Sequence, residues 1–285
     1  MIIDGHTHIF PDEVRKERQA YCKRDKGFSS IYKEPKARMA GVEDLIASMD
    51  EYGIERSVIC GFPWSEPDLC SLHNRYLMES ASRYPHRLIV FVILLFSDPG
   101  WSERELEVCL NEGVSGVGEI AFYRREMTPR DIEAVKPMIT RMEQKGVPLL
   151  LHVNETLGHS YPGKGKTPLD RFYDLVLSFP NLPVILAHWG GGLPFYELMP
   201  EVAKAMANVY YDTAASPYLY SKKIYSVVGQ IVGSEKILFG TDFPLLSPQR
   251  YFQELEGSGL SQEDRAKILG LNFSNLLGLD RRTGG

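Results

Sequence analysis

Eight short apolar runs, spaced along almost the whole chain, constrain its fold more than any other feature. They cover residues 1–9, 56–62, 88–96, 116–122, 147–153, 183–189, 209–214 and 236–242. Val, Ile and Leu dominate these runs with little polar alternation, which is typical of strands buried on both faces of a parallel sheet. The intervening segments carry apolar residues at three- and four-residue steps, as amphipathic helices require. The clearest of these segments are 41–52, 68–84, 129–144 and 170–179.

The alternation predicts an α/β fold in which eight strand and helix units form a (β/α)8 TIM barrel. Such barrels typically take about 250 residues, which suits this chain of 285 better than a division into two domains. We therefore expect one barrel domain over residues 1–280, followed by a frayed tail at 280–285.

One connection breaks this rhythm. About thirty residues, 10–40, separate the first strand from the first clear helix, and a connection that long is often functional. The segments that follow barrel strands lie at the C-terminal face, where barrel enzymes carry their active sites. We therefore predict an insertion loop at 10–40 that caps the active site and from which Tyr21, Lys23 or Arg24 could reach a substrate.

Composition and charge exclude several classes of partner. The formal net charge is -5 and the basic clusters are short, which argues against nucleic acid. The longest apolar run, 88–96, has half the length of a membrane span, which needs about 20 residues. Four cysteines without a CxxC pair, and no leader-like start, favour reduced thiols in a cytoplasmic protein. We expect a small-molecule substrate, and the helices after the seventh and eighth strands offer a face for a homodimer.

Histidines and carboxylates recur at the ends of the predicted strands. Side chains two positions apart on a strand point to the same face of the sheet, so His6 and His8 of the first run point in the same direction. The C-terminal ends of parallel barrel strands share one mouth. Imidazole and carboxylate groups together are ligands of Zn(II), and also of Mn(II), Fe(II) or Co(II). We therefore predict a divalent metal site, with zinc favoured, whose ligands are His6, His8, Glu119, His152, His188 and Asp242.

The motifs "DGHTH", "LLLHV", "ILAHWGG" and "ILFGTDFP", in this order, resemble those of the amidohydrolase superfamily in its amidohydrolase-related branch. The resemblance runs from Asp4 to the closing "ILGLNFSNLLG". This branch includes lactone hydrolases and zinc-dependent non-oxidative decarboxylases. The resemblance implies that His6, His8 and His152 bind the metal. It also implies that Asp242 binds the metal and moves a proton, and that His188 is either a catalytic group or a ligand of a second ion.

The glutamate of "GVGEIAF" distinguishes the two activities of the branch. Glu119 resembles a ligand of some two-metal hydrolases, whereas the other reading is a salt bridge with Arg124 or Arg125 at the barrel rim. It favours a metal-dependent hydrolase with one or two ions, acting on a small ester, lactone or amide that can carry a carboxylate. In that reading Asp242 is the general base for metal-activated water.

The alternative reading is a zinc-dependent non-oxidative decarboxylase of an unsaturated or aromatic acid. In that reading Asp242 delivers the proton that replaces CO2. A metal-binding barrel without catalysis is disfavoured, because an open water position beside an aspartate has little structural use.

Residues that immediately follow the strand ends are the candidates for substrate contacts. They are Tyr123, Arg124, Trp189 and Phe243, and the guanidinium of Arg124 would suit a carboxylate-bearing substrate. Asp4 shares the face of His6 and is expected to orient a histidine through a hydrogen bond. His73 lies in the middle of a predicted helix, so a surface or packing role is favoured.

Overall fold

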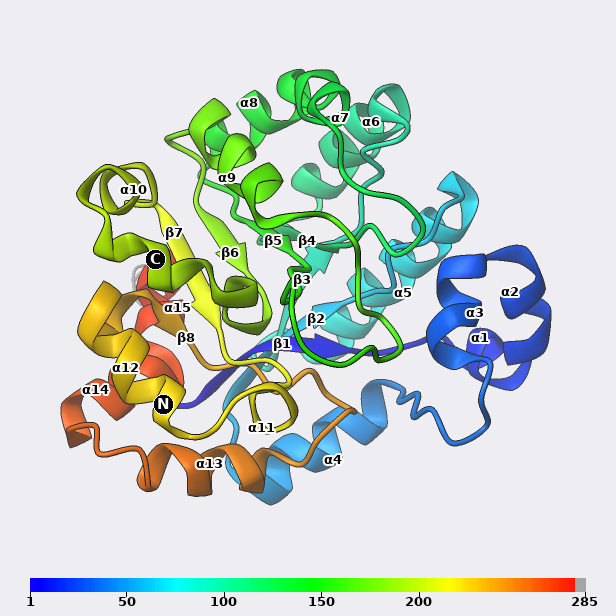
Figure 1. Ribbon diagram of the computed structural model, residues 1–285. Helices are drawn as coiled ribbons and strands as arrows, with labels where there is room; N and C mark the ends of the chain where they lie inside the picture. Colours follow the sequence, from blue (N-terminus) through cyan, green and yellow to red (C-terminus); the bar gives the residue numbers. More distant parts are fainter. Residues whose placement is uncertain (280–285) are drawn as a thin grey trace.

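The computed structural model describes residues 1–279, and its eight strands form a parallel barrel in the order β1 to β8 (Figure 1). The predicted TIM barrel is thus confirmed. The predicted domain end at residue 280 and the predicted frayed tail at 280–285 lie outside the described residues. The strands are β1 (Ile3–His8), β2 (Arg56–Cys60), β3 (Leu88–Val92), β4 (Gly116–Ile120), β5 (Leu149–Leu151), β6 (Val184–Leu186), β7 (Val209–Asp212) and β8 (Ile237–Leu238).

Each strand is shorter than the apolar run that predicted it, mainly at its C-terminal end. β3 ends at Val92, yet residues 93–96 continue the apolar run and are almost completely buried. These residues lie in a loop that is covered by the helices and by the 10–40 segment. Their side chains are apolar because they are buried, as those of the strand are. Burial pattern alone therefore cannot mark where strand pairing stops.

The barrel closes through backbone hydrogen bonds between β1 and the segment after β8. Gly5 N donates to Phe239 O at 2.8 Å, Asp242 N to His6 O at 2.9 Å and His8 N to Phe243 O at 2.8 Å. These bonds fix the backbone of Asp242 beside that of His6. A side chain at Gly5 would lie 2.3 Å from the Phe273 ring, so glycine permits the C-terminal helix to pack under β1.

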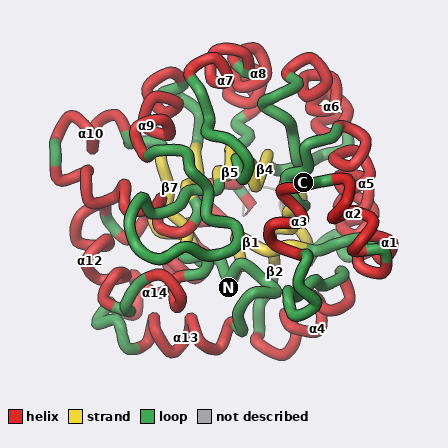
Figure 2. Tube along the Cα trace, turned by 45° about the vertical axis from the view of Figure 1, so that its right-hand side comes forward, coloured by secondary structure: helices red, strands yellow, loops and turns green. Residues whose placement is uncertain are grey.

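The helices form a ring outside the strands (Figure 2). The predicted helix at 129–144 is two helices that meet at Val135, because Pro137 has no N–H with which to continue the first one. The helices of this ring are α4 (Val42–Tyr52), α5 (Pro67–Arg83), α6 (Pro99–Asn111), α7 (Pro129–Ala134), α8 (Lys136–Lys145), α9 (Leu169–Ser178), α10 (Pro200–Ala205), α12 (Lys223–Val232), α13 (Pro248–Glu256) and α14 (Gln262–Ala266). Two further helices lie at the ends of the barrel: α11 (Ser216–Leu219) borders the cavity at the mouth, and α15 (Asn272–Leu277) packs under β1. Tighter or wider turns form η1 (His188–Leu198), η2 (Ser234–Lys236) and η3 (Lys267–Leu271).

The predicted loop at 10–40 is instead mostly helical. It contains α1 (Asp12–Lys16), α2 (Arg18–Arg24) and α3 (Lys26–Tyr32), which stand together at one side of the barrel (Figure 1). Asp25 starts α3, since its carboxylate accepts a hydrogen bond from Phe28 N at 2.8 Å. The loop prediction was wrong because each helix is too short to show a clear apolar period.

Two further expectations bear on the environment of the protein. The four cysteines are all unpaired and buried in the structure. Across residues 1–279, every helix is too short or too polar to cross a bilayer.

Candidate metal centre

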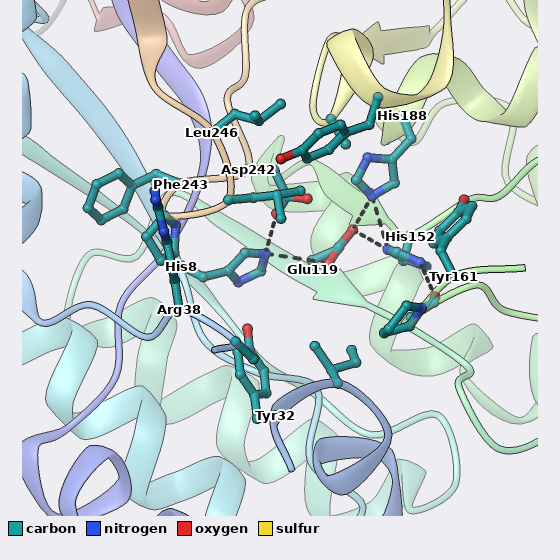
Figure 3. Close-up of a pocket in the computed structure, with 18 of the residues that line it drawn as sticks. His8, Tyr32, Arg38, Glu119, His152, Tyr161, His188, Asp242, Phe243 and Leu246 are labelled. Atoms are coloured by element: carbon teal, nitrogen blue, oxygen red, sulfur yellow. Dashed lines mark hydrogen bonds and ion pairs between the residues drawn. The ribbon is translucent and has the colours of Figure 1, made fainter. Parts of the chain in front are cut away.

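The six predicted ligands gather at the C-terminal mouth of the barrel. His6 and His8 lie in β1 and Glu119 in β4, while the other three lie in the segments that follow β5, β6 and β8. Glu119 lies in the middle of the group, with His8 on one side and His152 and His188 on the other (Figure 3). The strand-end rule, by which polar residues at the C-terminal ends of parallel barrel strands share one mouth, therefore predicted the meeting of side chains up to 236 positions apart in the chain, from His6 to Asp242.

The donor atoms form two groups that share Glu119. In the first, His6 Nε2 and His8 Nε2 are 3.1 Å apart. Glu119 Oε1 is 3.7 Å from His6 Nε2, and Glu119 Oε2 is 3.6 Å from His8 Nε2. In the second, His152 Nδ1 lies 2.8 Å from Glu119 Oε1 and 3.1 Å from His188 Nε2.

Asp242 joins the first group from the cavity side. Its Oδ1 lies 3.5 Å from His8 Nε2 and 3.8 Å from His6 Nε2. Its side chain is 19% exposed, against 2% for that of Glu119. The backbone of Asp242 has φ of 58°, a left-handed conformation that residues other than glycine seldom adopt. This turn aims the carboxylate at the cluster and leaves one side open to the cavity.

Hydrogen bonds to the outer ring nitrogens set the tautomers of the histidines. His6 Nδ1 lies 2.8 Å from Asp212 Oδ2, His8 Nδ1 lies 3.2 Å from Gly61 O, and His188 Nδ1 lies 3.0 Å from Ala214 O. These oxygens only accept, so each Nδ1 carries the proton and each Nε2 lone pair faces the cluster. His152 is reversed.

The outer nitrogen of His152 is Nε2, which donates to Gly163 O at 2.9 Å. Its Nδ1 is therefore the atom that faces Glu119. When the rings are neutral, all four imidazoles thus present an acceptor nitrogen to the same small volume.

This donor set fits a divalent metal ion. The lone pairs of His6 and His8 meet at 3.1 Å and repel each other unless a cation lies between them. Ligands about 2.0–2.2 Å from a tetrahedral ion lie roughly 3.3–3.6 Å from one another. The separations in the first group, 3.1–3.8 Å, bracket that range.

Electrostatics in the cluster also favour a cation. Burial raises the pKa of Glu119, but the adjacent imidazoles outweigh burial and hold that pKa well below its usual range. Burial lowers the pKa of His188, but its hydrogen bond to Glu119 and the charge of Asp242 raise it to about 9. Both shifts express the attraction of buried carboxylates for positive charge. A bound metal ion satisfies the same attraction.

Asp212, the last residue of β7, is a site residue that sequence reasoning missed. Its Oδ2 accepts a hydrogen bond from His6 Nδ1. Its Oδ1 accepts hydrogen bonds from His188 N at 2.8 Å and from Ala214 N at 3.0 Å. One buried carboxylate therefore orients ligands from β1 and β6. The strand-end rule that identified the other site residues, applied to the seventh run, would have found it.

A cavity of about 800 Å³ opens above the cluster. Phe62 and Tyr123 form part of its wall with stacked rings, 5.7 Å between centroids. Positive and polar groups of Lys36, Arg38 and Asn154 also line it. Further aromatic side chains on the wall are Tyr32, Tyr161, Tyr218 and Phe243.

The 10–40 segment does reach this cavity, but through other residues than those predicted. Its lining residues lie at 31–38, whereas Arg24 points to the surface and pairs with Glu66 and Asp68, each at 2.6 Å. Tyr21 packs against Trp64 and Lys23 is exposed. The helical folding of the segment turns these three side chains away from the mouth.

The structure brings two of the four predicted substrate contacts to the cavity, Tyr123 and Phe243. Trp189 is fully buried elsewhere, and its indole donates to Ser216 Oγ at 2.9 Å. β6 ends at Leu186, and the backbone from His188 to Gly192 has positive φ throughout, so strand alternation no longer directs Trp189. Arg124 is exposed to solvent, because the chain leaves the barrel after β4 ends at Ile120.

Two other expectations are also settled by geometry. Glu119 is buried among imidazoles rather than paired at the rim, and Arg125 instead pairs with Asp131 at 2.6 Å. Asp4 contacts the backbone N of His6 at 3.3 Å and the Thr241 hydroxyl at 2.6 Å, rather than a histidine ring. Asp4 therefore fixes β1 to the segment that carries Asp242.

The sequence profile of the amidohydrolase family matches residues 3–279. The chain belongs to the amidohydrolase family. Among its relatives is a gamma-resorcylate decarboxylase of Polaromonas sp., 25% identical over 298 residues, which are 87% of this chain and 91% of the relative.

Solved structures share the same barrel. The 5-carboxyvanillate decarboxylase from Sphingomonas paucimobilis has a TM-score of 0.79 at 15% identity, covering 97% of this chain and 98% of the other. A dihydroxybenzoic acid decarboxylase from Polaromonas sp., solved with bound manganese and 2-nitroresorcinol, has a TM-score of 0.75 at 21% identity, covering 98% and 97% of the two chains. These two likenesses concern the fold.

The relatives correct the predicted activity. The sequence favoured a hydrolase, with a decarboxylase as the alternative. The gamma-resorcylate decarboxylases that match this chain do so over 87–88% of its length, and they are lyases. The hydrolase prediction is therefore wrong, and the alternative agrees with the findings. Glu119 misled the prediction, because a glutamate on the fourth strand does not by itself distinguish the two reactions.

Proposed function

We propose that this protein catalyses the metal-dependent, non-oxidative decarboxylation of a hydroxylated aromatic acid. One observation carries the proposal: a partly exposed Asp242 carboxylate lies between a buried imidazole cluster and a cavity walled by aromatic rings. The names of the relatives support this class of reaction.

The cavity suits a flat ring with negatively charged substituents. The stacked Phe62 and Tyr123 offer apolar surface to an aromatic substrate, and Phe243 adds another ring to the wall. Arg38 and Lys36 place positive charge among the lining residues. We propose that they attract the substrate anion as it enters.

His6, His8, Glu119 and Asp242 would hold the ion. When bound there, a divalent ion supplies a Lewis acid that withdraws charge from substrate oxygens. The donors suit zinc, which the sequence favoured, and also manganese, which the Polaromonas structure contains. His152 and His188 offer donors for a second ion that would share Glu119. If a second ion binds there, metal analysis gives two equivalents per chain in the wild type and one in Glu119→Gln. A site for a single ion gives one equivalent in the wild type.

The proton step falls to Asp242. The bond between the ring carbon and the carboxyl carbon breaks, CO2 leaves, and the electron pair stays on the ring carbon. The protonated carboxyl group of Asp242 gives its proton to that carbon and later regains one from solvent through its exposed side. Glu119, at 2% exposure, has no such access and is suited to holding the ion rather than to moving a proton.

The proposal is tested by incubating metal-loaded protein with a panel of aromatic acids, including gamma-resorcylate and 5-carboxyvanillate. Release of CO2 together with the matching phenol is the expected result. Protein that is loaded with zinc and with manganese in separate preparations, and that releases CO2 from no member of the panel, would contradict the proposal.

A further inference from the structure

His73, which sequence reasoning gave only a surface or packing role, makes three hydrogen bonds at the mouth of the barrel. It lies on α5, fully buried. Its Nδ1 accepts from Phe62 N at 3.2 Å and from the Trp64 indole Nε1 at 3.0 Å. Since Nδ1 accepts from two N–H groups, the ring proton is on Nε2, which donates to Ile9 O at 2.7 Å.

Two of these bonds lead directly to His8. Ile9 is its neighbour in the chain. Gly61 O and Phe62 N belong to one peptide group, whose N–H donates to His73 Nδ1 while its C=O accepts from His8 Nδ1 at 3.2 Å. A single peptide group therefore joins the two imidazoles.

The fit around this peptide group is tight. A Cβ atom at Gly61 would lie 2.2 Å from Ile93 Cδ1 and 2.9 Å from His73 Cγ. The position of the Gly61 carbonyl is thus set by the His73 ring and by Ile93. A carbonyl whose own peptide N–H is hydrogen-bonded is also a stronger acceptor, so the bond to His73 strengthens the one to His8.

We propose that His73 is a positioning residue that prepares His8 for metal binding from outside the cluster. Through the Gly61–Phe62 peptide it holds the proton of His8 on Nδ1, and so keeps the Nε2 lone pair directed at the ion. Through Ile9 it fixes the end of β1 on the other side of the same residue. The inference rests on the proposed role of His8 as a metal ligand.

The same histidine also fixes part of the cavity wall. Phe62 stacks on Tyr123, and Trp64 stacks on Phe28 of α3 with 4.7 Å between ring centroids. Because His73 accepts hydrogen bonds from both Phe62 and Trp64, it connects the candidate metal ligand with the aromatic wall and the 10–40 segment. Loss of His73 therefore affects metal affinity first and substrate affinity second.

The experiment compares Mn²⁺ binding to metal-free wild type, His73→Phe and His73→Gln, with free Mn²⁺ measured by electron paramagnetic resonance. Phenylalanine fills the site without accepting or donating, so we expect affinity to fall about tenfold. Glutamine keeps an acceptor and a donor, so we expect the Mn²⁺ affinity of His73→Gln to lie between those of the wild type and His73→Phe. Asn272→Ala is the matched control, because it removes two buried hydrogen bonds at the opposite end of β8 and leaves Mn²⁺ affinity unchanged.

Each outcome separates this inference from the proposed function. Wild type that binds no metal would contradict the proposed function itself. Wild type and folded His73→Phe that bind Mn²⁺ equally well would overturn the role of His73 alone. If His73→Phe does not fold, His73→Asn takes its place, because its shorter amide cannot reach both Phe62 and Ile9. The same criterion applies to it.

A second readout needs no metal. NMR of isotope-labelled histidine in the metal-free protein reports which ring nitrogen of His8 carries the proton. We expect Nδ1 in the wild type and a mixture of tautomers in the His73 variants. An unchanged His8 tautomer in every variant would also overturn the inference.

Discussion

Asp242 is the residue whose side chain contacts both the imidazole cluster and the cavity. Its carboxylate reaches the imidazoles of His6 and His8 at 3.8 and 3.5 Å, yet keeps access to the cavity. The left-handed backbone at this position brings the side chain inward at the point where β1 closes the barrel. We therefore assign it the proton transfer of the proposed reaction.

Asp242→Asn tests this assignment. The amide keeps the shape of the side chain and an oxygen that can bind metal, but it cannot give up a proton at neutral pH. We expect kcat for CO2 release to fall roughly 100- to 10,000-fold while the protein stays folded. Asp170→Asn, at an exposed position, is the control. Turnover by Asp242→Asn within a few fold of wild type would refute the proton-transfer role.

Asp212→Asn separates orientation of the ligands from their presence. An asparagine oxygen can still accept from His188 N and Ala214 N, but its NH2 group would face His6 Nδ1 and force the ring proton onto Nε2. Metal affinity should therefore fall about 10- to 100-fold, measured by Mn²⁺ titration. Asp174→Asn, whose carboxylate pairs with Arg171 at the surface, should bind Mn²⁺ as the wild type does. Wild-type affinity in Asp212→Asn would exclude tautomer control by this residue.

His73 also makes stability depend on pH. Burial lowers its pKa to about 4 from an ordinary value of 6.5. Between these pH values the unfolded chain binds a proton that the folded protein does not, so the free energy of unfolding decreases as the pH falls. The loss amounts to about 3 kcal/mol between pH 6.5 and pH 4. Urea unfolding of metal-free wild type and His73→Gln should show their stability difference shrinking over this range, and a constant difference would contradict the shift.

At the scale of secondary-structure elements, the 10–40 segment is held to the barrel by Asp25. One oxygen of this buried carboxylate caps α3, and the other accepts from Ser65 N and Ser65 Oγ, both at 2.7 Å. The segment beyond α3 supplies Arg38 to the cavity. Asp25 thus couples a helix start to the loop after β2.

Asp25→Ala should loosen this segment without dismantling the cluster. Removing three hydrogen bonds from a buried acceptor should cost about 1–3 kcal/mol of unfolding free energy. We expect KM for the aromatic acid to rise several-fold with a smaller change in kcat, measured by steady-state kinetics. Asp12→Ala in the exposed part of α1 is the control. A larger loss in kcat than in KM would place the segment in the chemical step instead.

Element order and the gathering of the candidate ligands could be predicted because both follow from periodicity. Apolar runs mark strands, and parallel barrel strands share one end, so His6, His152 and Asp242 were brought together by counting alone. Side chains past the strand ends were less predictable. Trp189 lies in a left-handed stretch where the two-residue alternation no longer holds, and the residues at 31–38 reach the cavity only through the packing of three short helices.

The activity could not be predicted from the ligands, because hydrolysis and decarboxylation use the same imidazole and carboxylate donors. The wall of the cavity that the substrate would enter was not predictable either, because Phe62, Tyr123 and Tyr32 come from three separate segments. Their meeting depends on tertiary packing. Sequence periodicity does not specify it.

At the scale of the whole molecule, the barrel makes the site possible by joining the two ends of the chain. Three backbone hydrogen bonds connect β1 with residues 239–243, and they set His6 beside Asp242. The barrel interior below is filled by apolar side chains such as Phe91 and Phe273. The cluster therefore rests on a packed floor and communicates with solvent through the cavity side.

The central claim is that the buried cluster binds the metal on which decarboxylation depends. The most direct test is the release of labelled CO2 from carboxyl-labelled gamma-resorcylate as metal-free protein is titrated with Mn²⁺ or Zn²⁺. The account predicts that the rate rises from near zero in proportion to bound metal, with one phenol formed for each CO2. Equal release of CO2 by metal-free and metal-loaded protein would contradict it.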